Sequence, residues 1–287
     1  MKTKQPWLVF AIITTVFWGV WGALIEIPQR VFPPTLSYCV WALTMIPCAL
    51  VALKIINWKI DHNRRSILLG CTIGFTGAGG QLLLFEALRE GPAYIIFPFI
   101  SLYPILTIFL SVLILRERTN MLKWIGIGIA LIAILFLSYQ DPNQNTIKGK
   151  LWLVLSILVF VAWGLQAYIM KFSNETMKAE SIFFYMTITA LLLMPVAYLM
   201  TDFSLPIEWG FKGPYLAGMI QILNAIGALT LVYALRYGKA IIVVPMTGLA
   251  PLITIVISLI IYSVVPGLVL TIGLILALVA IFILSFD

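Results

Sequence analysis

Long apolar runs separated by short polar or basic segments dominate this chain. Glycine, proline and charged residues mark the ends of these runs. The runs predict ten helices of roughly the 20 residues that cross a bilayer. The predicted spans are Trp7–Ile25, Leu36–Ile56, Ser66–Leu88, Ala93–Leu115, Met121–Tyr139, Gly149–Met170, Ser181–Met200, Gly213–Leu235, Ala240–Tyr262 and Gly267–Phe286. Backbone polar groups must be paired inside a membrane, so this pattern predicts an all-α integral membrane protein.

The second half of the pattern repeats the first residue by residue. The segment Leu84–Leu115 aligns with Leu231–Tyr262 at a constant spacing of 147 residues, which matches Arg89 with Arg236. The repeat predicts two five-helix units, 1–139 and 149–287, joined by a polar linker at 140–148. Because five is odd, the second unit enters the membrane from the opposite side. The sequence therefore predicts an inverted 5+5 repeat, as found in many alternating-access transporters.

Each unit carries two prolines in its fourth span. Pro98 and Pro104 of the first unit align with Pro245 and Pro251 of the second. Proline removes a backbone hydrogen bond and permits a kink. These positions are predicted hinges or gates, and a static bend is equally consistent with the pattern.

Several motifs give the chain a family resemblance that covers nearly its whole length. They are Trp18-Gly19, Ala87-Leu88, Gly91-Pro92-Ala93 leading to Pro98 and Pro104, Leu115-Arg116-Glu117-Arg118-Thr119, and Trp124-Ile125-Gly126. With these motifs the chain resembles the EamA-type ten-helix members of the drug/metabolite transporter superfamily. The resemblance implies a small-metabolite transporter with a central cavity between the halves and peripheral fifth and tenth helices. The second unit departs at Glu117, which aligns with Val264, so the role of that glutamate is not duplicated.

Composition and charge support a membrane location. Hydrophobic residues make up 62% of the chain and charged residues 10%, far from the balance of a soluble domain. Most of the 18 Lys and Arg residues fall on the side of the predicted spans that holds both termini. The positive-inside rule then places both termini in the cytoplasm of a multi-pass protein of the inner or plasma membrane. The basic residues flank spans and form no patch, so the expected partner is the lipid bilayer and not nucleic acid.

Residue types exclude several kinds of chemistry. The single histidine, His62, rules out histidine catalysis and multi-histidine metal sites. Cys39, Cys48 and Cys71 share no CxxC spacing and are expected to be small buried hydrophobic residues. The sequence has no phosphate-binding loop for ATP. We therefore expect no metal, no cofactor and no enzyme activity.

Candidate substrate contacts lie near the middle of the predicted spans. Trp18 and Trp163 are repeat equivalents, and Trp21 and Gln166 lie three residues further along on the same helix faces. A pseudo-twofold axis would bring both faces to one central place, where aromatic rings could stack on a ligand or bind a cation. Core packing explains the tryptophans equally well.

Glu86 is the main charge predicted at membrane depth, where charges are costly and are a functional hint. It would contact the substrate or exchange a proton, unless it pairs with Arg89 at i+3. Its repeat equivalent is Tyr233, which would make the two ends of the pathway chemically unequal. Asn224 adds an amide that serves either the site or hydrogen bonding between helices.

These features together predict a secondary transporter for a small organic metabolite, with a small molecule as its partner. An acid among aromatic rings favours an amine-bearing or cationic substrate, such as an amino acid or a quaternary amine, with proton coupling as an open option. The alternatives are a sugar or nucleotide-type transporter of the same fold and an intramembrane lipid-handling protein. The small-residue pairs Gly126/Ala130 and Gly273/Ala277 are predicted to serve helix packing or a homodimer.

Overall fold

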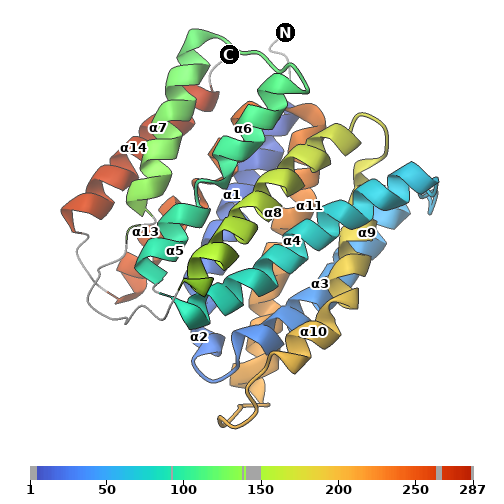
Figure 1. Ribbon diagram of the computed structural model, residues 1–287, viewed down its shortest axis with the longest axis vertical. Coiled ribbons are helices and arrows are strands. Elements are labelled where there is room, and N and C mark those ends of the chain that lie inside the picture. The colour runs from blue at the N-terminus through green and yellow to red at the C-terminus, as the bar shows by residue number, and fades with distance from the viewer. Residues whose placement is uncertain (1–4, 92, 138, 140–149, 263–266, 286–287) are drawn as a thin grey trace.

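The protein is described by a computed structural model covering residues 5–91, 93–137, 139, 150–262 and 267–285. The predicted linker at 140–148 lies outside these residues. All regular structure in the described part is helical (Figure 1). The helices of the first half are α1 (Pro6–Leu24), α2 (Glu26–Gln29), α3 (Pro34–Ile55), α4 (Arg64–Glu90), α5 (Ala93–Ile100), α6 (Tyr103–Leu113) and α7 (Met121–Leu137). Those of the second half are α8 (Leu151–Ser173), α9 (Ala179–Leu192), α10 (Met194–Leu199), η1 (Phe211–Tyr215), α11 (Leu216–Tyr237), α12 (Ala240–Thr247), α13 (Ala250–Tyr262) and α14 (Leu268–Ser285).

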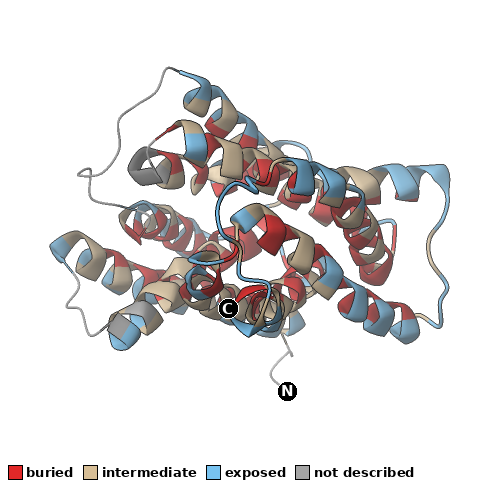
Figure 2. Ribbon diagram, turned by 90° about the horizontal axis from the view of Figure 1, so that it is seen from below, coloured by how far each residue is buried: buried red, intermediate tan, exposed pale blue. Residues whose placement is uncertain are grey.

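These helices form the ten predicted spans of an integral membrane protein. In the described part of the chain, eight helical stretches are long and apolar enough to cross a membrane, and Tyr103–Leu113 and Met121–Leu137 are shorter apolar helices. The fourth span consists of α5 followed by α6, and the ninth of α12 followed by α13. Large apolar side chains such as Phe75 and Leu199 are well exposed, as expected of a surface that faces lipid. Figure 2 shows exposed residues along the outside and buried residues where the helices meet.

The two halves pack as an inverted repeat. Helix α1 packs antiparallel against α11, and its repeat equivalent α8 packs antiparallel against α4, which is the equivalent of α11. Successive spans alternate in direction, so α8 crosses the bundle opposite to α1 (Figure 1). A pair of hydrogen bonds has the same symmetry. Thr107 donates to the Gly164 carbonyl and Thr254 to the Gly19 carbonyl, each at 2.9 Å.

The fourth and ninth spans are broken at equivalent positions. Helix α6 begins with Pro104 in its first turn, after a break at Ser101 and Leu102. The equivalent break precedes Pro251 between α12 and α13. Pro245 lies inside α12, whereas Pro98 lies in α5 with a side chain outside the described residues. The breaks lie at the second proline of each pair, and the hinge role stays a prediction.

The small residues of the fifth and tenth spans pack against each other within the chain. A Cβ on Gly126 would lie 2.8 Å from Ile283, and one on Gly273 would lie 2.9 Å from Phe136. Ala130 and Ala277 are fully buried. Helices α7 and α14 lie side by side at one edge of the bundle (Figure 1). The packing interpretation therefore holds for these faces, and a homodimer, which stays a prediction, would have to use another surface.

The bundle has two ends that recur below. The termini face holds the start of α1, the end of α14, the 114–120 connection and the 174–178 connection. The opposite face holds the 25–33 connection, Gly91 and the 200–210 connection. Figure 1 marks both termini near one end of the bundle.

Candidate functional site

The two central tryptophans lie at the contacts between the halves. The Trp18 indole N–H donates to the Asn224 carbonyl of α11 at 3.3 Å. The Trp163 indole N–H donates to the Gly77 carbonyl of α4 at the same distance. Gly77 and Asn224 are repeat equivalents, so both indoles make the same bond to the opposite half. The two indoles are thus placed equivalently by the repeat, and their meeting at one central substrate site stays a prediction.

Two equivalent glycines make room for these indole rings. A Cβ on Gly227 would lie 2.5 Å from the Trp18 ring, and one on Gly80 would lie 2.6 Å from the Trp163 ring. Only glycine allows such an approach without displacing the ring. Each tryptophan remains partly exposed, and Tyr103 meets Trp163 edge to face with 6.0 Å between ring centroids. Both tryptophans therefore have a packing role, and a substrate role would use only the remaining part of each ring.

The residues three positions further on differ between the halves. The Trp21 indole donates to Gln221 Oε1 at 2.8 Å, and Gln221 Nε2 donates to Ser37 Oγ at 2.9 Å. This chain ties α1, α11 and α3 together and consumes the Gln221 amide. At the equivalent position, the Gln166 amide lies against Gly77 and makes no hydrogen bond within the described residues.

The side-chain amide of Asn224 is likewise without a hydrogen bond in the part of the chain described. Helices α8 and α11, which carry Gln166 and Asn224, are in contact. Two amides at membrane depth thus keep donors and acceptors for a ligand. They are the polar groups of the predicted site that the fold leaves unused.

In this structure Glu86 pairs with Arg89 of the same helix, which was the alternative to a substrate contact. Arg89 Nη1 lies 3.0 Å from Glu86 Oε2, and the Arg89 and Glu86 side chains are 64% and 32% exposed. Pairs of this kind on a helix surface contribute little to stability. Glu86 lies near the end of α4 at the opposite face, away from the tryptophans. Its role toward a substrate or a proton stays a prediction.

A cavity of about 640 Å³ opens at the opposite face. Its wall comes from the 29–35 segment, the last turns of α4 and the chain that follows α10. The lining residues are Gln29, Arg30, Val31, Phe32, Pro33, Pro34, Thr35, Phe85, Leu88, Arg89, Met200, Asp202, Leu205 and Pro206. Both arginines have acidic neighbours, because Arg30 pairs with Glu26 at 3.1 Å and Arg89 with Glu86. The lining thus combines three charged residues, Arg30, Arg89 and Asp202, with mainly apolar side chains.

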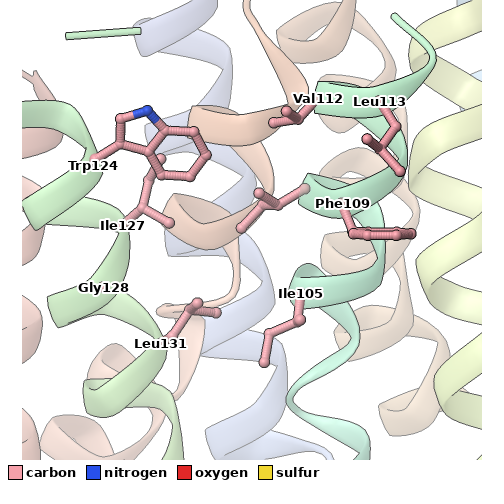
Figure 3. Close-up of a pocket in the computed structure, with 9 residues that line it drawn as sticks. Ile105, Phe109, Val112, Leu113, Trp124, Ile127, Gly128 and Leu131 are labelled. Carbon is pink, nitrogen blue, oxygen red and sulfur yellow. The ribbon is translucent and has the colours of Figure 1, made fainter. Parts of the chain in front are cut away.

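A second hollow of about 400 Å³ lies between α6 and α7. Ile105 and Val112 of α6 lie across it from Trp124 and Leu131 of α7 (Figure 3). Its lining is apolar apart from the Trp124 N–H. This groove suits lipid chains better than a polar metabolite.

Tyr233 lies at the termini face, in a contact that the sequence did not reveal. Its hydroxyl donates to Glu180 Oε1 at 2.7 Å, and its ring stacks on Phe10 with 5.1 Å between centroids. Glu180 is 9% exposed, although it immediately precedes the predicted span Ser181–Met200. One turn further, Arg236 donates to the Met177 carbonyl at 3.1 Å. These bonds tie the end of α11 to the start of α9.

The structure also gives a role to Glu117. From the connection between α6 and α7, its carboxylate accepts hydrogen bonds from the backbone N–H groups of Ala240 at 3.0 Å and Ile241 at 3.1 Å. It therefore caps the N-terminus of α12, in the other half. Burial raises the pKa of this carboxyl, against the lowering effect of the two N–H groups, Lys171 and Lys239.

Two lysines, Lys171 and the buried Lys123, also make polar contacts at this face. Lys171 lies 4.0 Å from Glu117 and donates to the Gly238 carbonyl at 2.8 Å, just beyond the end of α11. Lys123 is 7% exposed and donates to the Leu284 carbonyl at 2.9 Å near the end of α14. Both lysines lie next to short polar segments of the sequence, where a lysine normally gives no sign of burial.

Comparison with known proteins identifies the family. The model of the EamA-like transporter family matches residues 5–139 and 150–286. The chain belongs to the EamA-like transporter family. It is therefore a multi-pass membrane protein of a transporter family, as the motifs around Trp18, Gly91 and Glu117 suggested.

Individual relatives and a solved structure agree with this assignment. Protein LicB of Haemophilus influenzae is 27% identical over 86% of this chain and 84% of its own length. A probable 4-amino-4-deoxy-L-arabinose-phosphoundecaprenol flippase subunit, ArnE of Hamiltonella defensa, is 33% identical over 28% of this chain and 73% of its own length. An uncharacterised Methanocaldococcus jannaschii protein is 28% identical over 47% of this chain but 97% of its own length. A crystal structure with 14% identity superposes with a TM-score of 0.82 over 99% of this chain, so the fold is shared.

Proposed function

We propose that this protein is a secondary transporter that moves a small organic metabolite, unchanged, by alternating access. The observation that carries the proposal is the unequal state of two equivalent ends. The termini face is tied together by Glu180, Tyr233, Arg236 and Glu117, whereas the opposite face has a cavity of about 640 Å³. An inverted repeat can exchange these two conditions between its halves, which is the basis of alternating access.

Substrate flux tests this proposal directly. Purified protein in sealed vesicles should accumulate labelled substrate, and vesicles without protein should not. A thermal-shift screen of amino acids, amines, quaternary ammonium compounds, sugars and nucleotides would choose the label. Failure of every stabilising compound to cross the membrane would contradict transport.

We place the substrate beside Trp18, Trp21, Trp163, Gln166 and Asn224, between the halves. The partly exposed rings and the unused amides of Gln166 and Asn224 support this placement. Trp163→Ala should weaken binding by about 1–2 kcal/mol, the size of a favourable aromatic contact with a cation. Trp124→Ala, which removes a ring from the apolar α6–α7 groove, is the matched control. Equal binding by both variants would leave packing as the only role of Trp163.

For substrate class, we propose an amine-bearing or cationic metabolite. The aromatic lining supports this choice, and so does the amino sugar in the name of the relative ArnE. Amines and quaternary ammonium compounds should stabilise the protein more than neutral sugars of similar size. A larger shift with sugars or nucleotides would favour the alternative substrate classes.

Proton coupling through Glu86 is the finer part of the proposal. Glu86→Gln should abolish the pH dependence of transport while preserving exchange of substrate between the two compartments. Glu26→Gln, which changes another acid of the opposite face, is the control. An unchanged pH profile in Glu86→Gln would remove Glu86 from the coupling mechanism.

We propose that both termini are cytoplasmic and that the protein lies in the inner or plasma membrane. The excess of Lys and Arg at the termini face supports this orientation. A cysteine at Asn143 should react with an impermeant maleimide in whole cells, whereas a cysteine at Arg64 should react only after permeabilisation. The reverse pattern would invert the topology.

A further inference from the structure

Two pairs of helix ends match residue by residue in the inverted repeat. Helices α3 and α9 begin at Pro34 and Ala179, after N-cap residues with closely similar backbone angles. Helices α4 and α11 end at Glu90 and Tyr237, each followed by an extended glycine. The register is thus fixed at both ends. Four pairs of equivalent positions follow from it: Phe32 and Met177, Thr35 and Glu180, Glu86 and Tyr233, and Arg89 and Arg236.

In the second half, these positions bond to one another and close the termini face. Tyr233 donates to the Glu180 carboxylate at 2.7 Å, and Arg236 donates to the Met177 carbonyl at 3.1 Å. Both bonds run from the end of α11 to the start of α9. One acid, one hydroxyl, one guanidinium and one backbone carbonyl make up this closure.

In the first half, the same chemical groups are present but have other partners. Arg89 bonds to Glu86 on its own helix at 3.0 Å, and Thr35 bonds to Thr201 at 2.8 Å. Phe32, Thr35 and Arg89 line the cavity of the opposite face. Phe32 is 2% exposed, and within the described residues no hydrogen bond reaches its carbonyl. This carbonyl is therefore available as an acceptor at the wall of the cavity.

The acid and the hydroxyl have exchanged helices between the halves. In the second half the acid lies at the start of α9 and the hydroxyl on α11. In the first half the hydroxyl, Thr35, lies at the start of α3, and the acid, Glu86, lies on α4. The pair can therefore form at either end, with donor and acceptor in reversed positions.

We propose that Glu86, Arg89, Thr35 and the Phe32 carbonyl form the gate that closes the opposite face when the termini face opens. In that state Thr35 donates to the Glu86 carboxylate and Arg89 donates to the Phe32 carbonyl. The inference rests on the proposed alternating access. It gives Glu86 and Arg89 a gating role at this end of the pathway.

Paired cysteines test the gate. Thr35→Cys and Glu86→Cys are combined in a background where Cys39, Cys48 and Cys71 are replaced by alanine. The protein is reconstituted in vesicles and treated with a short bifunctional thiol reagent. Cross-linking should be low in this background, because the structure has the gate open.

Weakening the opposite closure should raise the yield. Tyr233→Phe removes the hydroxyl that holds Glu180 and should increase cross-linking by about two- to tenfold, the effect of one hydrogen bond on an equilibrium. Tyr237→Phe is the matched control. Its ring also stacks on Phe10, but its hydroxyl makes no hydrogen bond within the described residues. Glu117→Gln, which weakens the cap on α12, is an independent second driver in case Tyr233→Phe does not fold.

Equal yields in the parent, both drivers and the control would overturn the gate. So would a Glu180→Cys/Tyr233→Cys pair whose cross-linking, with Glu117→Gln as the driver, rises together with that of the first pair, since the two closures must alternate. Vesicle flux separates this result from the proposed function. If substrate crosses the membrane but the cross-linking yields of the two cysteine pairs do not change in opposite directions, only the gate is refuted. If the yields change in opposite directions but no substrate crosses the membrane, transport is refuted.

Discussion

At the termini face, Glu117 and Lys171 are little exposed and connect different helices. At the opposite face, two exposed arginines, Arg30 and Arg89, pair with acids three or four residues away in the sequence. Glu117 and Lys171 are 8% and 15% exposed, but Glu26 and Arg30 are 65% and 60% exposed. Equivalent ends of one repeat have thus acquired different electrostatics. A symmetric backbone therefore does not require symmetric stabilisation.

The largest expected difference between the ends concerns Glu117 and Glu86. Glu117→Ala should lower the free energy of unfolding by about 3 kcal/mol, because two charge-assisted hydrogen bonds are lost and two N–H groups remain unpaired. Glu86→Ala should cost about 0.5 kcal/mol or less, as for an exposed ion pair. Thermal unfolding in detergent measures both. Similar losses in the two variants would contradict the comparison.

The centre of the bundle should behave symmetrically, in contrast to its ends. Gly80→Ala and Gly227→Ala should each cost about 1–3 kcal/mol, because a methyl group would overlap a tryptophan ring. Gly128→Ala is the matched control, since a Cβ there meets nothing within 4 Å. A large loss in one central variant and none in the other would show that the halves differ in the core as well.

The smallest expected effect is an opposite pH dependence at the two faces. Glu117 has a raised pKa, so the pH-dependent part of its contribution to stability is fully present below the ordinary glutamate pKa of about 4.3 and is lost as the pH rises through the raised value. Hydrogen bonds from Ser204 lower the pKa of Asp202. Its contribution is therefore present above the ordinary aspartate pKa of about 3.9 and is lost as the pH falls.

Melting temperatures measured against pH check this prediction. Relative to the parent, Glu117→Gln should gain stability as the pH rises, whereas Asp202→Asn should lose it. The difference from the parent in each variant isolates one carboxyl from all other titrating groups. Differences of the same sign would show that one assignment is wrong.

The sequence predicted the helical architecture because apolar runs of membrane-spanning length show it directly. It predicted the inverted repeat because residues such as Pro104 and Pro251 match between the halves. It did not predict the burial of Glu180 and Lys123. A charge at the end of an apolar run looks solvent-exposed, and only the packing of neighbouring helices decides whether water reaches it. Helix tilt and crossing are therefore the missing information.

The candidate site was predicted only in part for a related reason. The sequence placed Trp18 and Trp163 at equivalent central positions. Their hydrogen-bond partners are the backbone carbonyls of Asn224 and Gly77, and a pattern of side chains cannot predict a bond to a backbone carbonyl. The match of Gly80 with Gly227 was available as a signal of close helix approach. It would have favoured packing for part of each ring.

The paired bonds from Thr107 to Gly164 and from Thr254 to Gly19 have a mechanical consequence. They connect the fourth span of each half to the first span of the other near the middle of the bundle, so each connection can act as a fulcrum for the helix. From Gly164 to the start of α8 the arm is about 20 Å, at a rise of about 1.5 Å per residue. A rotation of about 10° around the fulcrum displaces the end of such an arm by about 3 Å. A rotation of this kind would move the two ends of the bundle while the centre keeps its hydrogen bonds.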